Sequence, residues 1–418
     1  MPRKDIKVHI DIHALQTVPY SNLNRDALGS PKNCLYGGKL RTRVSSQSWK
    51  RAIRLKLEEQ LGEPTIRTRR IAEAVRDELQ QRGWDSETAR KAGRAVLVSA
   101  DGAAKRSSKK EGGIMPDGGT DQSKVLFWIP NGAINDLADL CERYREEIAA
   151  TDLPPEEETE QQNNKKKSAN SKPPKPDIVV PSEEVDSLLR KRSASINLLG
   201  RMLAEIPEHN VDGATQFAHA FTTHESTTDF DFFTAVDDRV GNGVQEESGS
   251  TETGTGHLAT AEFTSGVFYR YSSVNVTDLA SNLSGKSQPT PEDTDQALSV
   301  LDTYLRAFCN AMPSGKRRTT AASTPPELVY LTVRRNPLSL AGAFEKPVTA
   351  ERDGGYAETS RVRLNTYTDR LYRFLGTDEL LWHGHAGLND SPLNALGERD
   401  ESLHDLITNG INQAGDHA

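Results

Sequence analysis

The sequence predicts a mixed α and β protein, and three kinds of observation carry that prediction. Short stretches alternate apolar and polar residues, as half-buried strands do, while longer stretches repeat their apolar residues every three or four positions, as amphipathic helices do. A strand, a helix and a second strand follow one another between residues 265 and 333, which is the order of a βαβ unit. We therefore expect helices packed on a sheet, and a chain of 418 residues is long enough for two or three domains.

The N-terminal segment predicts the first strands and the first helix. "KVHIDIHALQTV" alternates apolar with polar residues from Val8 to Ala14, which indicates a half-buried strand. The Gly-Ser-Pro run at 29–31 breaks regular structure, so a loop follows. In "YGGKLRTRVSSQSWKRAIR" the two glycines favour a turn, "LRTRVS" favours a short strand, and Ser45 or Ser46 is a favoured N-cap for a helix.

The middle of the chain combines helical periodicity with polar insertions. Residues 64–100 and 133–149 have helical spacing, and residues 124–129 are typical of a strand. Residues 101–123 hold too few apolar residues to fold, so we expect a long loop there. Residues 151–176 are rich in proline, glutamate, glutamine and lysine, and burial cannot offset their ordering entropy; we expect disorder.

The last third is more regular. After a flexible insertion at 241–256, the chain alternates as a strand at 265–276 and again at 327–333. Between them, residues 291–312 predict a helix with an acidic first turn, as the helix dipole favours. Together with the N-terminal strand and its helix, the simplest architecture is a ferredoxin-like sheet, on which the other helical and flexible segments are elaborations.

Composition excludes several classes of protein. The three cysteines, Cys34, Cys141 and Cys309, are too far apart for a disulfide framework or a metal-binding spacing, and they fit a reducing, cytoplasmic location. The start of the chain lacks the long apolar run of a signal peptide. An apolar stretch of about 18 residues, which a membrane span needs, is also missing. We expect a cytoplasmic protein with no membrane partner.

Charge is segregated along the chain, although the net charge is -8. Residues 1–56 hold twelve Lys/Arg and three Asp/Glu, whereas residues 225–262 hold nine Asp/Glu and one Arg. Nucleic-acid binding depends on local potential, so an acidic total does not exclude a basic groove near the N-terminus.

The helix predicted after Ser45 has one cationic and one apolar face. Its N–H groups, positive dipole end and serine hydroxyls form an anion site, for which backbone phosphate is the natural ligand. A solvated charged face is the alternative, but here no acid interrupts the cations for two turns. The polar face consists of Gln47, Lys50, Arg51 and Arg54, the apolar face of Trp49, Ala52, Ile53 and Leu57, and the upstream loop adds Arg25, Lys32, Lys39, Arg41 and Arg43.

Five segments resemble the CasC-type backbone subunit of the type I-E CRISPR Cascade complex, in the order of that family. The resemblance extends from about residue 6 to about residue 350 and is poor at 101–123, 151–176 and after 350. The segments are "LNRD" (23–26), "YGGKLRTRVSSQSWKRAIR" (36–54), "HAFTTHESTTDFDFFTAVDD" (219–238), "EFTSGVFYRY" (262–271) and "PLSLAGAFEKPV" (337–348).

The resemblance implies an α+β fold shaped like a right hand. It implies an RRM-like palm from residues 1–60 and 257–350, and helical fingers from 61–200 with disordered insertions at 101–123 and 151–176. It further implies a β-hairpin thumb at 219–262, followed by a helical and loop tail at 351–418.

The resemblance also implies a function without catalysis or a cofactor. Copies would polymerise head to tail along the CRISPR RNA, a contact geometry that generates open filaments. Each palm would grip the guide backbone, each thumb would displace one nucleotide at a regular interval, and the guide would pair with a target DNA strand. The implied partners are CRISPR RNA, target DNA, neighbouring copies and other Cascade subunits.

Site residues follow from the resemblance one position at a time. The loop and helix positions would contact RNA phosphates, the thumb positions would lie by the displaced nucleotide, and two further loops would add contacts. Because relatives can carry Trp where this chain has Phe232, stacking there has less surface. The residues are Arg25, Lys32, Ser45, Gln47, Lys50, Arg51, Arg54, Phe232, Phe233, Thr234, Arg201 and Met202 in "GRM", Lys316, Arg317 and Arg318 in "SGKRRTTAA", and Lys346 in "FEKP".

Other functions remain open at this point. A metal-dependent RNA-cleaving relative would use either the acidic and histidine-containing segment or Asp26 in "LNRD". A stand-alone RRM-like single-strand RNA-binding module is suggested by the aromatics of "GVFYRY", which lack the full RRM signature. "SGKS" (284–287) is not a phosphate loop, since Ala280 stands where a glycine is required. The possible metal ligands are His219, His224, Asp229, Asp231, Asp237 and Asp238.

Overall fold

The computed structural model describes residues 7–107, 114, 121–151, 178–236 and 255–418. The chain divides into two compact units. We call residues 1–57 with 215–418 the sheet unit, and residues 58–214 the helical unit.

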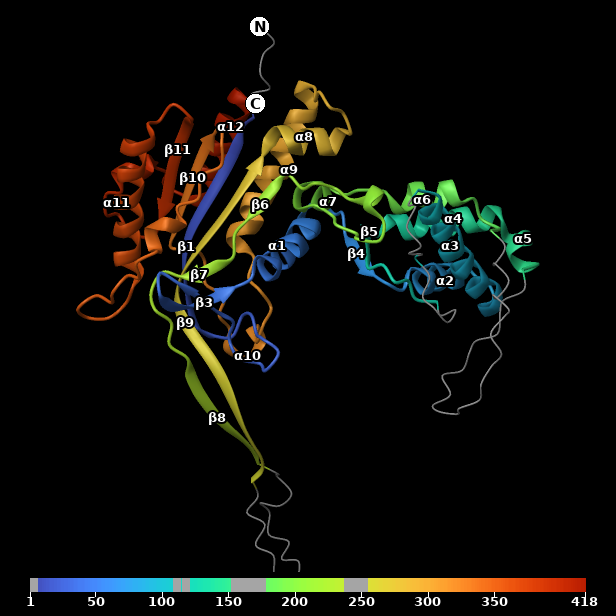
Figure 1. Ribbon diagram of the computed structural model, residues 1–418, viewed down its shortest axis with the longest axis horizontal. Coiled ribbons are helices and arrows are strands. Elements are labelled where there is room, and N and C mark those ends of the chain that lie inside the picture. Colours follow the sequence, from blue (N-terminus) through green and yellow to red (C-terminus); the bar gives the residue numbers. More distant parts are fainter. Residues whose placement is uncertain (1–6, 108–113, 115–120, 152–177, 237–254) are drawn as a thin grey trace, which may run out of the picture. The chain divides into compact units, whose positions relative to one another are not determined.

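One large sheet organises the sheet unit (Figure 1). Its order is β12-β11-β10-β1-β9-β7-β3-β2, and β6 and β8 also pair with β9. The central strand β1 is antiparallel to both neighbours, with Ile12 opposite Ser272 of β9 and Leu331 of β10. The strands are β1 (His9–Ser21), β2 (Asn33–Tyr36), β3 (Lys39–Val44), β6 (Thr215–Phe217), β7 (Ala220–Thr222), β8 (Asp229–Val236), β9 (Thr255–Asn275), β10 (Leu328–Arg334), β11 (Leu380–Gly387) and β12 (Glu398–Arg399).

Helices α1 (Ser46–Leu61) and α9 (Pro291–Asn310) pack on one face of the sheet. At the centre of this contact the buried Arg270 of β9 lies between two rings, 3.7 Å from Trp49 of α1 and 4.2 Å from Phe308 of α9. The two terminal nitrogens of its guanidinium donate to Gln16 Oε1 and to the Phe308 carbonyl, so neutral acceptors and aromatic faces stabilise this buried cation.

The opposite face carries a cluster of aromatic side chains that is fully covered. Tyr269, Tyr330 and His13 pack with Phe344 of the short helix η2 (Ala341–Phe344) and Leu364 of α11 (Ala357–Leu375). Burial lowers the pKa of His13 to about 3, so the ring is neutral and bonds to the Tyr269 hydroxyl. The remaining helices of this unit are α8 (Val276–Ser284), α10 (Arg317–Thr320), η3 (Asn394–Leu396) and α12 (Leu403–His417).

The helical unit has its own hydrophobic core. Val75, Leu97 and Leu137 come from three different helices and are fully buried together. A two-stranded sheet of β4 (Thr65–Thr68) and β5 (Phe127–Pro130) adds Phe127 to this core. The helices are α2 (Ile71–Gln81), α3 (Ser86–Ser107), α4 (Gly132–Arg143), α5 (Arg145–Ala149), α6 (Ser182–Leu189), α7 (Ala194–Leu199) and η1 (Pro207–His209).

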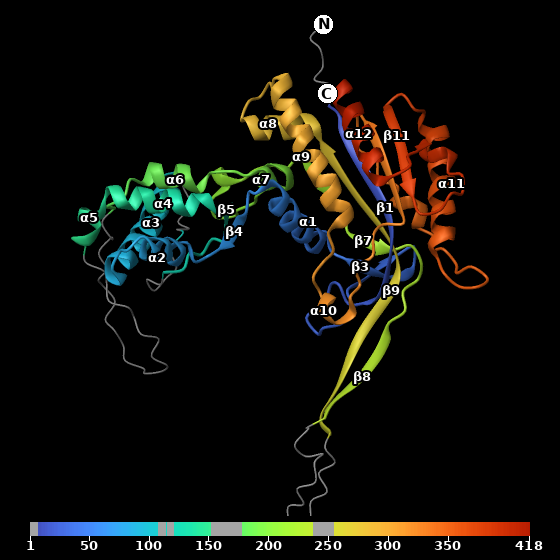
Figure 2. The same ribbon diagram turned by 180° about the vertical axis from the view of Figure 1, so that it is seen from behind.

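A long antiparallel hairpin extends from the sheet. Strand β8 pairs with the first half of β9, from Asp229 opposite Phe263 to Val236 opposite Thr255. Figures 1 and 2 show from both sides that this pair runs beyond the other strands of the sheet unit. We call residues 229–236 with 255–263 the β8–β9 hairpin.

Most predicted elements are confirmed, and five expectations need correction. The first strand, predicted to be half-buried, is buried on both faces from His9 to Gln16, because helices cover both sides of the sheet at β1. Strand β2 was missed because only four residues precede its turn at Gly37 and Gly38, which both have positive φ. Strand β4 was missed inside a segment read as helical. Residues 101–107 belong to α3, not to a loop, because apolar positions such as Ala104 face the helical core. The expected helical and loop tail also contributes strand β11 to the main sheet. The disorder expected at 151–176 falls almost entirely outside the described residues.

Candidate nucleic-acid interface

The start of α1 is held by two side chains from elsewhere in the sheet unit. The Ser45 N–H donates to Asn24 Oδ1 at 2.9 Å, and the Ser46 N–H donates to His219 Nδ1 at 2.8 Å. The Ser48 N–H donates to Ser45, as in an N-cap. The predicted N-terminus is therefore confirmed, but protein acceptors already bind part of the anion site expected there.

The two faces of α1 agree with the helical wheel except at Arg54. Trp49, Ile53 and Leu57 are fully buried, as predicted. On the polar face Gln47 and Arg51 are exposed and Lys50 is half-buried. Arg54, however, is only 7% exposed, since it neighbours the buried Leu57 and Glu58 on the next turn. A phosphate contact from Arg54 therefore stays a prediction that its burial disfavours.

The loop before β2 lies against this helix start. Asn24 joins the two, because its side chain accepts from Ser45 while its carbonyl accepts from the Lys32 N–H. Asp26 Oδ1 accepts from the Leu28 and Ser30 N–H groups, a local turn that keeps Arg25 exposed. Arg25 and Lys32 are thus placed beside the first turn of α1.

A third basic segment, from far along the sequence, packs on the same loop. A Cβ on Gly315 would lie 2.3 Å from the Leu23 carbonyl, so only glycine permits this approach. The next three residues, Lys316 to Arg318, form a short cationic turn at the start of α10. Lys316 is half-buried, and the two arginines are exposed. We call the resulting set the basic surface: Arg25, Lys32, Arg43, Lys50, Arg51, Lys316, Arg317 and Arg318.

Arg41 does not join the basic surface. It is fully buried and donates to the carbonyls of Thr222, Phe344 and Glu345. Burial lowers its pKa, and the carbonyls replace the lost hydration. The expectation that Arg41 adds to the cationic loop is therefore wrong. Its side chain links β3 by hydrogen bonds to the end of η2 and to the residue that follows.

Arg201 also points inward, within the helical unit. It is 3% exposed and its guanidinium donates to several backbone carbonyls, so an RNA contact from this side chain is disfavoured. Burial lowers its pKa to about 10. Its neighbour Met202 is 84% exposed and remains available for contact. The carbonyls belong to Trp128, Leu189, Arg190, Lys191 and His209.

The β8–β9 hairpin presents aromatic and acidic side chains. Phe230, Phe232 and Phe233 are 62%, 70% and 50% exposed, and strand alternation places Phe230 and Phe232 on one face and Phe233 on the other. Thr234 pairs with Leu258 in the same hairpin. Phe230 was missed by the sequence analysis, although its spacing of two from Phe232 in "DFDFF" indicates the shared face.

The last predicted contact, Lys346, lies away from α1 along the sequence but beside the β2–β3 turn. It is exposed and follows Glu345, whose carbonyl would lie 1.8 Å from a Cβ on Gly37. The glycine at this turn is therefore required by both its positive φ and this close approach.

The two histidines offered as metal ligands are each engaged by backbone. His219 accepts from Ser46, whereas His224 is buried, accepts from the Val267 N–H and stacks on Tyr356 at 3.7 Å. Within the described ranges, no group of three His, Cys, Asp or Glu residues gathers to hold a metal. Asp237 and Asp238 lie outside the described residues.

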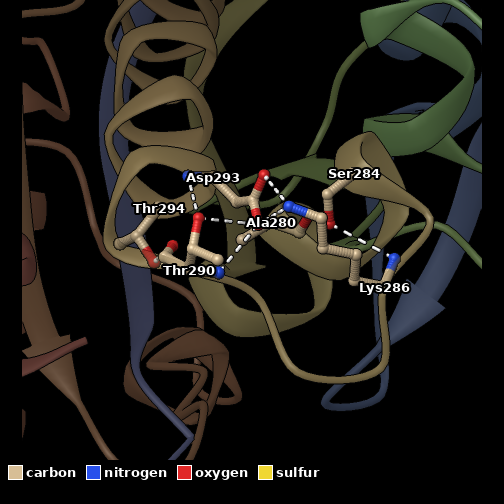
Figure 3. Close-up of polar contacts among 6 residues, drawn as sticks. All are labelled: Ala280, Ser284, Lys286, Thr290, Asp293 and Thr294. Carbon is tan, nitrogen blue, oxygen red and sulfur yellow. Dashed lines mark hydrogen bonds and ion pairs between the residues drawn. The ribbon is translucent and has the colours of Figure 1, made fainter.

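The "SGKS" segment forms a helix-cap network (Figure 3). Ser284 ends α8 and donates to the Ala280 carbonyl, while the Lys286 ammonium lies 2.8 Å from Asp293. Asp293 and Thr290 form the capping box of α9. This lysine therefore balances the carboxylate of a helix cap.

Electrostatics at the basic surface favours neutral Cys34 and His219. Burial raises the pKa of the Cys34 thiol, although Arg43 and Arg41 oppose the shift. The pKa of this thiol rises even within a basic region, because desolvation outweighs the cations. Burial, followed by the charges of Arg43 and Lys32, lowers the pKa of His219, so its ring remains an acceptor for Ser46.

The aromatics of "GVFYRY" do not form an open stacking platform. Tyr269 and Tyr271 face the core beneath η2 and α11, and Phe268 packs against Trp49 on the other face. An RRM that stacks bases on its central strands needs such rings exposed. This burial disfavours a stand-alone RRM-like module.

Comparison with known proteins gives concordant matches. The family model of CT1975-like proteins matches residues 10–409. A chain of a "CRISPR RNA-guided surveillance complex, pre-nicking" is 39% identical with a TM-score of 0.80, and the match covers 97% of this chain and 100% of that one. A chain of a "CRISPR RNA-guided surveillance complex" is 34% identical with a TM-score of 0.71, covering 97% and 99%. A search of the curated proteins finds no match.

None of the described helices combines the length and the apolar character needed to cross a bilayer.

Proposed function

Because this chain belongs to the CT1975-like protein family, we propose that it is the CasC-type backbone subunit of a type I-E CRISPR Cascade complex. Copies polymerise head to tail along the CRISPR RNA in the cytoplasm and associate with the other Cascade subunits. The protein holds the phosphate backbone, and base pairing with a target DNA strand supplies the sequence specificity. Full-length likeness to two surveillance-complex chains supports this role.

The observation that carries the proposal is the basic surface. Two neighbouring segments and a third from far along the sequence bring their cations together, around residues 25–32, 43–51 and 316–318. Gathering like charges costs free energy unless an anion binds there, and a phosphate backbone offers a row of anions. An acidic total charge then limits binding elsewhere on the protein.

We further infer an RRM-like palm in the sheet unit. The antiparallel order β10-β1-β9-β6, with α1 and α9 connecting strands on one face, supports this interpretation. The helical unit takes the place of the fingers and the β8–β9 hairpin that of the thumb, with Phe232, Phe233 and Thr234 beside a displaced nucleotide.

We propose that the subunit does not cleave nucleic acid. Asp26, the residue to suspect, accepts two backbone N–H groups within its own turn. Purified protein incubated with labelled RNA and Mg²⁺ or Mn²⁺ should leave the RNA intact. Cleavage that disappears in Asp26→Asn, which keeps an acceptor for the turn, would instead establish a metal-dependent nuclease.

Co-expression with a CRISPR array tests the main proposal. Negative-stain images of the purified material should show curved filaments, or a seahorse-like particle when the other subunits are present, and guide-length RNA should co-purify. A monomer without RNA, in cells that contain processed guide, would contradict the backbone role. Stoichiometric monomeric binding to unrelated single strands would favour the stand-alone RNA-binding module.

A further inference from the structure

A β-bulge interrupts the central strand pair near the end of β1. Val18 lies opposite Gly266 and Ser21 opposite Thr264, so β1 has one more residue than β9 across this step. Pro19, which has no N–H to give to a ladder, fits such a position. A bulge bends its strand and redirects a side chain, and the side chain redirected here belongs to Tyr20.

Tyr20 completes a stack of three groups. Its ring lies parallel to that of Phe263, with centroids 4.1 Å apart and an angle of 16° between the planes. The Lys316 ammonium lies 4.2 Å from the centroid of the same Phe263 ring. Phe263 is buried, whereas Tyr20 is 39% exposed, so the stack ends at solvent on the tyrosine. Stacking on Phe263 therefore fixes the orientation of the Tyr20 ring before any ligand binds.

The surroundings of Tyr20 change from cationic to acidic within a short distance. Asn22, two residues on, donates to the Gly29 carbonyl of the Arg25 loop and to the Glu262 carbonyl of the β8–β9 hairpin. On the hairpin side, partial burial and then the charges of Asp231 and Asp229 raise the pKa of the Tyr20 phenol. The phenol is thus neutral. The ring lies beside the basic surface, and it stacks on Phe263, which stands opposite Asp229 in the β8–β9 pair.

A neutral ring next to carboxylates favours contact with a nucleobase over contact with a phosphate. Carboxylates repel a phosphate, while the neutral π-face of a nucleobase stacks on an aromatic ring whatever its sequence. We propose that Tyr20 is a stacking platform for a nucleobase of the RNA strand whose phosphates the basic surface holds. The inference rests on the proposed function and adds a base contact at the junction of the basic surface and the hairpin.

The test uses the full chain and synthetic single-stranded RNA in which 2-aminopurine replaces one base at a time. In the wild type, fluorescence should be quenched at positions that recur along the bound strand. Tyr20→Leu keeps apolar packing on Phe263 but removes the π-face, so it should relieve part of this quenching and weaken RNA binding about tenfold. Tyr20→Phe and Tyr20→Trp should retain the quenching.

Phe374→Leu is the matched control, since it changes an exposed aromatic of α11 in the same way. It should leave the fluorescence pattern and affinity unchanged. Quenching that persists unaltered in Tyr20→Leu would overturn this inference but not the proposed function. If this variant also self-associates more weakly while its quenching pattern is unaltered, Tyr20 would instead belong to a contact between copies. Wild-type protein that binds no RNA would overturn the proposed function and the inference together.

Discussion

The basic surface and the β8–β9 hairpin belong to the same unit but offer a nucleic acid opposite chemistry. The basic surface gathers cations from three segments, whereas the described hairpin residues 229–236 and 255–263 include three carboxylates and neither Lys nor Arg. Three phenylalanines are exposed on this hairpin. The first region suits a charged backbone, and the second suits neutral base faces.

Two regions with opposite chemistry would let one protein bind the phosphates and the bases of a strand at different places. Under the proposed function, salt-dependent attraction would hold the phosphates at the basic surface, while the carboxylates near the aromatic rings would repel them. The exposed rings of the hairpin would then contact bases rather than phosphates. Separate variants in each region should therefore change RNA binding in distinguishable ways.

The largest effect is expected from reversing charge on the exposed part of α1. In Lys50→Glu with Arg51→Glu, loss of two charge-assisted contacts should weaken RNA binding by about 3–6 kcal/mol per copy and abolish assembly on a guide. Gel filtration with bound RNA measures this. Arg54 is left unchanged because its burial would mix binding with stability.

Arg352→Glu with Arg370→Glu is the matched control for this charge reversal. Both arginines are exposed in the sheet unit and lie outside the basic surface. This double variant has the same net charge as the first. If the control variant blocks assembly equally, the total charge of the protein governs RNA binding. The basic surface would then have no special role.

A second large effect should separate a structural arginine from a binding one. Arg201→Ala leaves buried carbonyls without donors, so the helical unit should lose about 3 kcal/mol or more of stability. Hydrogen exchange should show lost protection within residues 58–214. The exposed neighbour Arg192 offers a control, Arg192→Ala, with little change. An Arg201→Ala protein with unchanged exchange but weaker RNA binding would restore Arg201 as a contact.

A smaller effect is expected at the hairpin. Phe232→Ala removes a 70% exposed ring, so it should weaken RNA binding by about 1–3 kcal/mol without affecting protein stability. Fluorescence anisotropy with labelled RNA measures the loss, and Phe232→Trp should recover or exceed the wild-type affinity. Equal affinities for the alanine and wild-type proteins would remove the base-binding role from this side chain.

The smallest effect concerns pH and the start of α1. The His219 pKa lies below its ordinary 6.5, so acidification protonates this histidine in the unfolded chain before the folded one. The stability it contributes is present above pH 6.5 and is lost as pH falls through the lower folded pKa. His219→Asn keeps an acceptor for the Ser46 N–H without titrating, so its melting temperature should fall slightly less on acidification. An NMR titration that places the His219 pKa at or above 6.5 would contradict this.

Periodicity predicted the apolar side of α1, because Trp49, Ile53 and Leu57 recur at helical spacing. It failed at Arg54, which stands at the border of the two faces, where a wheel cannot decide burial. Arg201 lay beyond any periodic pattern, since the carbonyls around it come from η1, from the end of α6 and from strand β5. The family resemblance located the hairpin, and the alternation of side chains along β8 places its phenylalanines on two faces.

The sequence predicted the cations around α10 as a separate basic loop. It did not predict that they lie beside the loop of Arg25. That proximity depends on the close approach of Gly315 to Leu23, a contact across about 290 residues of sequence. Tyr20 was missed for a similar reason: the bulge that redirects it exists only in the pairing of β1 with β9. Local patterns therefore predicted elements, and long-range contacts determined which side chains meet.

The salt dependence of RNA affinity tests most directly whether the basic surface binds phosphates and the hairpin binds bases. Each lost phosphate contact should reduce the slope of log affinity against log salt by about 0.7 for a single strand. Lys50→Gln with Arg51→Gln should therefore lower the slope by about 1.4, whereas Phe232→Ala should lower affinity by the same factor at every salt concentration. Equal slopes for the glutamine variant and the wild type, or a reduced slope in Phe232→Ala, would contradict the division of phosphate and base binding between the two regions.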